Sequence, residues 1–366
     1  MAPYPANADE LFQHHILQGV SRTFALTIPQ LPPELHRAVA NAYLLCRIAD
    51  TLEDDSKLSF DQKLTYCNLF VDIVNGSKNA HEFSSEIPNK LGPHTSAAEK
   101  ELIARTETVI RITHSLNTNQ REAMLRCVTK MTEGMILYQG AETLNGLENQ
   151  NALDRYCYYV AGVVGEMLTH LFCDYCSELK ASQKKMLHLS VSFGQGLQMT
   201  NILKDIWTDR ERGACWLPAD EFRSRGIVLS ELNRTTEKEA FQEVLGSLIG
   251  VAHGHLDNAL TYTLMLPRSE VGIRRFCLWA LGMAVLNLRK INANRSFSSG
   301  SEVKITRTAV KATIATTSLC TRSNLALKTL FQVASAGLPK YRVETPMSSI
   351  ADIIERPSSQ SENNAL

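Results

Sequence analysis

Two short stretches of this 366-residue chain carry carboxylates at a spacing that suits metal binding. In the first, DTLEDD at residues 50–55, Asp50 and Asp54 are four residues apart, so a helix would point both carboxylates the same way. Tyr43 and Arg47 continue this stripe upstream. Carboxylates suit a hard divalent cation and a guanidinium suits a phosphate group. The alternative is a solvated acidic helix end, although acidic residues at a helix C-terminus oppose the helix dipole.

The second stretch holds Asn201, Asp205 and Asp209 at positions i, i+4 and i+8. Because a helix rises 1.5 Å per residue, these oxygens would span roughly 12 Å along one face. Gln198 and Gly194 extend the face upstream, where a glycine either leaves room for a ligand or marks close helix packing. A solvated face is again the alternative, but apolar neighbours favour burial: Ile202, Ile206 and Trp207. Buried carboxylates need partners, and a metal ion is one.

Taken together, the two stretches predict a more specific chemistry than either does alone. Two helices that each offer carboxylates four residues apart could grip Mg²⁺ ions around a diphosphate, since Mg²⁺ uses one or two carboxylates plus phosphate oxygens. Neutralising a diphosphate leaving group allows its C–O bond to ionise. The resulting allylic cation would need a dry, apolar pocket.

Two further segments add candidate site residues. Tyr156 begins the run YCYYVAGVVG, in which Ala161, Gly162 and Gly165 either clear a channel for a hydrocarbon chain or serve tight helix packing. Tyr156 itself could supply a polar group near a cation or accept a proton. The segment SRTF at residues 21–24 offers Ser21 and Arg22 to a phosphate, unless they form an ordinary cap and surface ion pair.

The elements that must position these residues are predicted to be helices. Gly (19 residues) and Pro (12) are few, which favours long uninterrupted elements. Only residues 303–316 show a weak strand-like alternation. We expect an all-α single domain over residues 9–340, between a lead (1–8) and a polar, disordered tail (341–366). The segments assigned to helices are 34–54, 97–139, 154–179, 182–209, 237–266 and 272–292, and those assigned to loops are 75–95 and 145–151.

Composition excludes several classes and indicates a compartment. Lys plus Arg and Asp plus Glu are 38 each, and this zero net charge argues against a nucleic-acid binder. Nine cysteines without a framework, including the lone CxxC at 173–176, indicate reduced structural thiols. The most apolar run, 276–288, is too short to span a membrane and predicts a buried helix. With no visible signal peptide, we expect a cytoplasmic protein, in transient contact with a membrane when its product is apolar.

Four segments, in this order along the chain, resemble the squalene/phytoene synthase family of head-to-head prenyl transferases. They are SRTF (21–24), YLLCRIADTLEDD (43–55), YCYYVAGVVG (156–165) and GLQMTNILKDIWTDRERGACWLP (196–218). The resemblance covers about residues 11–335 and implies an isoprenoid-synthase-type helical bundle around a central cavity. It also implies roles for individual residues. The residues implied for Mg²⁺ binding are Asp50, Glu53, Asp54, Asn201, Asp205 and Asp209. The residues implied for substrate binding are Ser21, Arg22, Tyr43, Arg47, Gln198, Asn201 and Lys204. The residues implied for catalysis are Tyr156 and the four aspartates, Asp50, Asp54, Asp205 and Asp209.

Within the family, DTLEDD and residues 274–307 are similar to squalene-forming members. This likeness implies that two farnesyl diphosphates condense to presqualene diphosphate, which NADPH then reduces to squalene. Because Gly194-Gln195-Gly196 is no dinucleotide-binding fingerprint, NADPH would share the helical cavity, with Lys304 and Arg307 as its phosphate partners. Lys204 departs from a usual arginine. His15 departs from a lysine linked to NADPH, and no C-terminal membrane anchor is apparent, as in bacterial-type soluble forms.

Other functions stay open at this point. Dehydrosqualene or phytoene synthesis without NADPH is the alternative within the family. Class I terpene cyclases and head-to-tail synthases share the fold but carry DDxxD-type motifs, whereas this chain has DTLED. A non-catalytic helical lipid-binding protein is the alternative outside enzymes, although a binder has no need of four metal-gripping carboxylates.

Overall fold

The computed structural model describes residues 8–21, 23–139, 143–233, 238–341 and 343, and the long elements within these ranges are helices. This part of the chain contains no β-strand, and one isolated bridge pairs Leu147 with Pro218. The predicted all-α, single-domain class is therefore confirmed. Arg22 lies outside the described residues, as do most of the lead and the tail.

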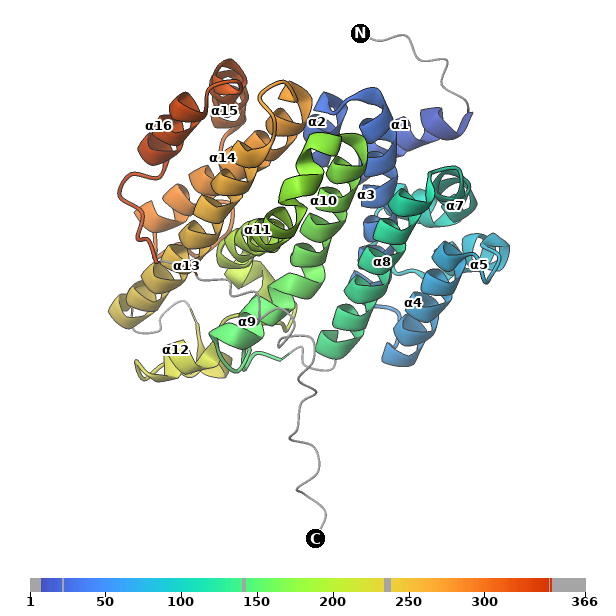
Figure 1. The fold of residues 1–366 in the computed structure, drawn as a ribbon. Coiled ribbons are helices and arrows are strands. Elements are labelled where there is room, and N and C mark those ends of the chain that lie inside the picture. The colour runs from blue at the N-terminus through green and yellow to red at the C-terminus, as the bar shows by residue number, and fades with distance from the viewer. Residues whose placement is uncertain (1–7, 22, 140–142, 234–237, 342, 344–366) are drawn as a thin grey trace.

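The elements follow one another along the chain with few long connections (Figure 1). Their bounds are α1 (Ala8–Val20), α2 (Phe24–Thr27), η1 (Ile28–Gln30), α3 (Pro33–Asp54), α4 (Phe60–Asn75), α5 (His81–Lys90), α6 (Ala97–Ala104), α7 (Thr106–His114), α8 (Thr118–Gln139), α9 (Gln150–Cys157), η2 (Tyr158–Gly162), α10 (Val163–Tyr175), η3 (Ser177–Ser182), α11 (Gln183–Glu211), α12 (Ala219–Arg223), η4 (Leu229–Glu231), α13 (Lys238–Met265), α14 (Val271–Ala293), α15 (Arg307–Cys320) and α16 (Asn324–Ala334).

Helix α11 lies at the centre and packs against α10, α13 and α14. Helix α10 also contacts α3 and α8, so it stands between the two helices that carry the acidic stretches (Figure 1). Helices α4 to α7 cover the outside of α3 and α8, whereas α15 and α16 form an outer hairpin on α14.

Helix α3 forms where its apolar spacing predicts it. The five residues of the predicted apolar face are at most 7% exposed: Leu35, Val39, Ala42, Cys46 and Ala49. Burying this face against the neighbouring helices stabilises the helix more than intrinsic propensity does. The same orientation leaves the stripe of Tyr43, Arg47 and Asp50 only half-buried.

Two segments that were not assigned to helices from the sequence each contain one. The predicted loop at 75–95 holds α5, because Phe83 and Ile87, four residues apart, are buried and anchor a polar segment. The weakly alternating 303–316 segment holds most of α15, whose buried threonines lie on one face and bond back to the preceding turn. In both cases packing decides the structure where the local sequence is ambiguous.

The predicted helix 154–179 is interrupted. It begins earlier, at α9, where the Asn149 side chain accepts a hydrogen bond from the Ala152 N–H, and α10 ends at Tyr175. Between them lies η2, a single π-helical turn closed by the Val163 N–H on the Tyr158 carbonyl. Such turns are rare and are frequent at functional sites. This turn follows Tyr156 by two residues.

The glycines near this turn serve close helix crossing. A Cβ at Gly194 of α11 would collide with the backbone oxygen of Ala161, and one at Gly165 of α10 would collide with that of Ser190. A Cβ at Gly162 would crowd Val191. The small residues are therefore explained by packing, and the interpretation as a hydrocarbon channel is wrong for them.

Helix α14 (Val271–Ala293) is the apolar helix predicted around residues 276–288. By length and composition it could cross a membrane, and among the described residues it is the one helix that meets this criterion. However, 56% of its most apolar window is buried inside the protein, where it packs against α11, α13 and α15. This burial agrees with a core helix.

A polar cluster is buried between α11 and α13. The Ser192 hydroxyl lies 2.8 Å from His255 Nδ1 and accepts a hydrogen bond from Asn258, while His255 Nε2 has no hydrogen-bond partner among the described residues. Burial lowers the pKa of His255 from 6.5 to about 4. Folded His255 thus stays neutral over a range in which the unfolded chain takes up a proton.

His255 therefore makes the fold more sensitive to acid. Its contribution to the free energy of unfolding falls by on the order of 2–3 kcal/mol as the pH drops from about 6.5 to about 4, whereas burial raises the pKa of Asp50 and Asp209 and so acts in the opposite direction. In His255→Gln the His255 contribution should disappear, so the stability of this variant relative to the parent chain should rise as the pH falls, and the exposed His14→Gln serves as the control. Urea unfolding across this pH range measures it, and an unchanged slope in His255→Gln would contradict it.

Candidate active site

Helix α3 presents the first acidic stretch from its last two turns. The Asp50 side chain is 34% exposed, and Arg47 Nη1 lies 3.9 Å from Asp50 Oδ2. Burial and the charge of Asp54 raise the pKa of Asp50 to about 7. Burial likewise raises the pKa of Asp54, although Arg47 and Arg212 oppose it. Both carboxylates are therefore held where ionisation is unfavourable without a cation.

The other stripe residues of α3 already have protein partners. Arg47 forms an ion pair with Glu99 of α6, and the Tyr43 hydroxyl donates to the Val20 carbonyl over 2.9 Å. Ser21 accepts a hydrogen bond from the Phe24 N–H at 2.9 Å, which is the cap that we considered, and it lies beside Tyr43. Glu99 was not predicted, because nothing in the sequence pairs it with a residue 52 positions away.

Helix α11 presents the second acidic stretch near its C-terminal end. Lys204 Nζ lies 3.0 Å from Asp205 Oδ2 and donates to Asn201 Oδ1 over 3.3 Å. Burial and the neighbouring charge of Asp205 raise the pKa of Asp209 to about 6. Gln198 lies half-buried one turn before Asn201.

The two stretches meet. The charge of Asp54 contributes to the raised pKa of Asp209, and Arg212 lowers the pKa of both carboxyls. Burial raises the pKa of Tyr156 strongly, and the charges of Glu53, Asp209 and Asp54 raise it further. The fold thus brings the phenol of α9 within electrostatic range of carboxylates on α3 and α11. Arg212 follows the second motif directly but was not among the residues predicted for the site.

Aromatic side chains fix the ring of Tyr156. The Trp216 ring stacks on it, with centroids 4.1 Å apart and planes 7° from parallel. Tyr138 of α8 meets it edge-on at 5.2 Å. Parallel and edge contacts of this kind hold an aromatic ring in one orientation. Trp216 was also missed, because a turn residue gives no sign of what it stacks on.

Asp55 has a different role from its neighbours. Its carboxylate accepts hydrogen bonds from the N–H groups of Lys57 (2.9 Å), Leu58 (3.2 Å) and Gly92 (2.7 Å) and from the Thr95 hydroxyl (2.5 Å). Burial opposes its ionisation, but these four bonds outweigh burial and lower its pKa. Asp55 therefore ties the end of α3 to the 92–95 turn.

Substitutions of the adjacent residues Asp55 and Asp54 should have different effects on the free energy of unfolding. Asp55→Ala is expected to cost about 2–4 kcal/mol of unfolding free energy, because it leaves buried donors without an acceptor. Asp54→Asn, the adjacent control, should leave stability unchanged or raise it slightly. Thermal unfolding of both variants measures this, and a stable Asp55→Ala protein would contradict the anchoring role.

The segment after α14 also reaches this end of α11. The Trp207 indole donates to the Phe297 carbonyl over 2.7 Å, and a Cβ at Gly300 would lie 3.2 Å from Asp205 Oδ1. Lys304 and Arg307 follow and are exposed. The loop therefore places Gly300, four residues before Lys304, against the second acidic stretch.

No three Asp, Glu, His or Cys side chains converge closely enough to bind a metal ion among the residues that the structure describes. The donors instead come in pairs: Asp50 with Asp54, and Asp205 with Asp209. This arrangement fits Mg²⁺, which takes one or two carboxylates and completes its shell with phosphate oxygens and water. The raised pKa values of Asp50 and Asp209 reflect burial first and then the repulsion of a neighbouring carboxylate, and a divalent cation would offset both.

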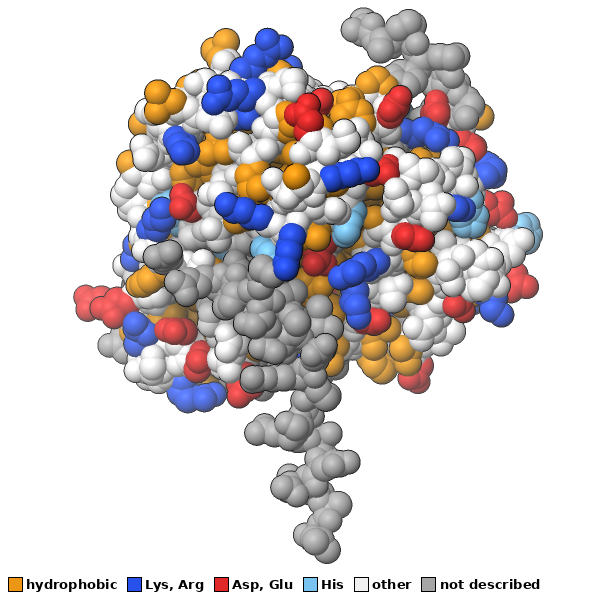
Figure 2. Space-filling model, viewed as in Figure 1, with side chains coloured by type: hydrophobic (Ala, Val, Ile, Leu, Met, Phe, Trp, Pro, Cys, Tyr) orange, Lys and Arg blue, Asp and Glu red, His pale blue; other side chains and the backbone are white. Residues whose placement is uncertain are grey.

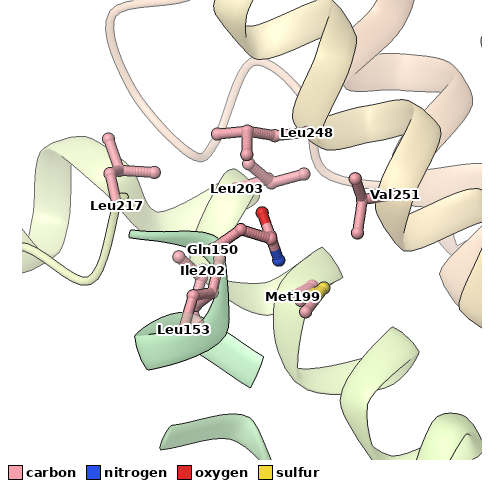
Figure 3. A pocket seen from close by; sticks show the side chains of 8 residues that line it. All are labelled: Gln150, Leu153, Met199, Ile202, Leu203, Leu217, Leu248 and Val251. Atoms are coloured by element: carbon pink, nitrogen blue, oxygen red, sulfur yellow. The ribbon is translucent and has the colours of Figure 1, made fainter. Parts of the chain in front are cut away.

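A separate pocket lies between α9, α11 and α13 (Figure 3). Its cavity volume is about 10 Å³, and apart from Gln150 its lining is apolar: Leu153, Met199, Ile202, Leu203, Leu217, Leu248 and Val251. This is room for about one water molecule and far below the roughly 300–1,000 Å³ of a usual ligand pocket. It does not represent the central cavity that the resemblance implies, and that cavity stays a prediction.

Comparisons with known proteins show which family this chain belongs to. The squalene/phytoene synthase family model matches residues 17–309, which include both acidic stretches and Tyr156. The chain belongs to the squalene/phytoene synthase family. The matched range contains α3 and α11, which carry the two acidic pairs, and α9, which carries Tyr156.

Curated relatives and solved structures agree with this family assignment. Squalene synthase of Eremothecium gossypii is 29% identical over 293 residues (77% of this chain, 62% of the relative), and squalene synthase ERG9 of Saccharomyces cerevisiae is 28% identical over 308 residues (83% and 65%). That of Nicotiana benthamiana is 31% identical over 283 residues (75% and 62%). The chain thus spans less than two thirds of the length of these relatives.

Solved structures show a similar fold. TcSQS in complex with the ligand BPH1237 superposes with a TM-score of 0.74 at 24% identity, covering 95% of this chain and 96% of that one. A dehydrosqualene synthase in complex with a ligand gives 0.61 at 18% identity, covering 89% and 97%. At these identities the likeness concerns the fold alone, so the predicted isoprenoid-synthase-type bundle is confirmed, and site roles are argued from the residues.

Proposed function

We propose that the protein joins two farnesyl diphosphates head to head to presqualene diphosphate and reduces this intermediate to squalene. The observation that carries the proposal is that the charges of Asp54 and Asp209, from two different helices, both act on the Tyr156 phenol, while Arg212 acts on both carboxylates. Such a site suits a substrate with two parts: the carboxylates could bind its diphosphate through Mg²⁺, and the phenol ring could contact its apolar chain. The catalytic unit is assigned to residues 9–340, as the sequence analysis expects.

In this proposal the paired carboxylates are the Mg²⁺ ligands. The candidates are Asp50, Glu53, Asp54, Asn201, Asp205 and Asp209, all oxygen donors of the kind that this hard cation prefers. Bound Mg²⁺ would neutralise the diphosphate and so lower the barrier to breaking the C–O bond. Arg212, which acts on both Asp54 and Asp209, is positioned to bind a phosphate oxygen and to balance charge between the two stretches.

The other site residues orient the reacting groups. Arg47, held by Glu99, offers a fixed guanidinium beside Asp50, and Lys204 does the same as an ammonium beside Asp205. Tyr156 keeps its proton near neutral pH because burial and the nearby carboxylates raise its pKa. Its hydroxyl can therefore donate a hydrogen bond to the departing diphosphate while the ring faces the allylic chain. Ser21, Arg22, Tyr43 and Gln198 complete the proposed substrate set.

NADPH is assigned to the exposed bases after the 296–302 loop. As a bound cofactor it would supply the hydride of the second stage. Lys304 and Arg307 offer two cationic groups for its phosphates near the loop seated on Asp205. His15 on α1 is exposed, and no contact with NADPH is assigned to it.

A double substitution tests this assignment. Lys304→Ala with Arg307→Ala should raise the KM for NADPH by roughly tenfold or more and leave presqualene diphosphate formation unchanged, because only phosphate contacts are lost. Lys311→Ala on the same helix is the matched control. Steady-state kinetics at varied NADPH measure the effect, and normal turnover of the double variant would remove the assignment.

Product analysis tests the proposed function as a whole. The full chain is incubated with farnesyl diphosphate and Mg²⁺, with and without NADPH, and the products are identified by gas chromatography–mass spectrometry. Squalene only with NADPH, and presqualene diphosphate without it, is the expected result. Dehydrosqualene regardless of NADPH would overturn the reductive stage, and no consumption of any prenyl diphosphate would overturn the enzymatic proposal.

A further inference from the structure

Charge is segregated along this chain. The net charge is zero over 366 residues, yet no Asp or Glu occurs between Glu302 and Glu344. The described part of this segment carries six basic residues: Lys304, Arg307, Lys311, Arg322, Lys328 and Lys340. Such a one-sided distribution produces a local positive potential although the whole protein is neutral.

The hairpin of α15 and α16 presents this charge on the outside. Lys340 is neutralised by Asp257 at 2.9 Å, but Lys311, Arg322 and Lys328 are exposed and form no ion pair with any described acidic residue. Arg268, on the turn before α14, is also exposed. Figure 2 shows basic and hydrophobic side chains side by side at the upper end of the molecule, over α14 and α15.

The tip of the hairpin is apolar. Leu319 is the second-last residue of α15 and Leu325 is the second residue of α16, and they are 87% and 77% exposed on either side of the turn that carries Arg322. Leucines of the core, by contrast, are at most a few per cent exposed. Leu319 and Leu325 thus form a small exposed apolar surface with the positively charged Arg322 beside it.

The hairpin is firmly seated on its inner side. Leu327 packs with Leu278, Trp279 and Met283 of α14 in a satellite hydrophobic cluster, which Val310 and Ile314 of α15 extend. The exposed leucines are therefore not the remainder of a loosely packed core. The inner face packs against α14, whereas no described residue covers the outer face or the tip.

We infer that the α15–α16 tip docks on an anionic lipid bilayer, with Leu319 and Leu325 in the headgroup–acyl boundary and Arg322, Lys328 and Arg268 on the phosphates. A short apolar insertion combined with a basic rim is how peripheral proteins bind such surfaces. The inference rests on the proposed function in one respect: a farnesyl substrate and a squalene product both partition into lipid.

Vesicle binding tests the inference without reference to turnover. The full chain should float with vesicles of phosphatidylcholine and phosphatidylglycerol, release on raising the salt, and bind vesicles of phosphatidylcholine alone much more weakly. Leu319→Ser with Leu325→Ser, and separately Arg322→Glu with Lys328→Glu, should each weaken binding by roughly tenfold or more. Leu11→Ser with Lys185→Glu, exposed residues on α1 and α11, is the matched control.

The outcomes separate this inference from the proposed function. No binding of the parent chain, or binding that neither tip variant weakens, overturns it. Dimerisation that the leucine double variant abolishes also overturns it, in favour of a second copy as occupant. All variants should keep the parent rate with detergent-dispersed farnesyl diphosphate, so an inactive parent chain that binds vesicles would overturn only the proposed function.

Discussion

Replacing Asp209 by asparagine should lower kcat by about 10²–10³-fold while making the metal-free protein more stable. The activity falls because Asn keeps the shape of the side chain but supplies no charge to the diphosphate-bound Mg²⁺, and one lost electrostatic contact of this kind has an effect of that size. The stability rises because burial and the charge of Asp205 raise the pKa of Asp209 to about 6. Its ionised form is thus unfavourable in the fold near neutral pH.

The gain in stability should be about 1 kcal/mol, since this partly exposed carboxylate is screened by water. Pyrophosphate release and thermal unfolding in a chelator measure the two effects on the same sample. Asp61→Asn, an exposed carboxylate on α4, is the control and should change neither. An Asp209→Asn protein that loses stability together with activity would identify Asp209 as a scaffold residue instead.

Tyr156→Phe should lower kcat of the first stage by about 10²-fold with little change in KM. The ring would keep its stack on Trp216 at 4.1 Å and its edge contact with Tyr138, so only the hydroxyl is removed. A hydroxyl that donates to a leaving group contributes rate of this order. Presqualene diphosphate formed in a single turnover, without NADPH, isolates this stage.

Trp216 allows a complementary change. Trp216→Leu keeps the hydroxyl but removes the face that orients it, and we expect roughly a tenfold loss of kcat. Trp216→Phe should recover most of this loss, which a purely structural defect would not allow. Equal rates for the parent chain and Tyr156→Phe would reduce Tyr156 to a packing residue.

Much of the site was predictable because its parts are local. Asp50 and Asp54, or Asp205 and Asp209, share a helix face through the helical period alone, and the buried face of α3 follows from the same period. Which helix faces which is not local. The sequence stripes give no distance between Asp54 and Asp209. That the two stretches act together was inferred from their shared chemistry and from the family resemblance.

What the sequence could not provide are the partners that tertiary packing supplies. Glu99 reaches Arg47 from α6, and Trp216 reaches Tyr156 from the turn after α11. Similarly, α5 was taken for a loop because its polar residues outnumber the two buried ones that hold it. In each case the deciding interaction is between residues far apart in sequence or few in number.

Because of the π-helical turn η2, the geometry of the site depends on the number of residues between α9 and α10. An α-helix turns by about 100° per residue, so the extra residue in this turn offsets the face of α9 from that of α10 by about that angle. Deleting one residue from 158–162 would allow a continuous α-helix that keeps the packing of α10 but turns Tyr156 away from Asp54 and Asp209. In an evolutionary sense, one deleted codon could therefore abolish the chemistry and keep the fold, with every site residue still present in the sequence.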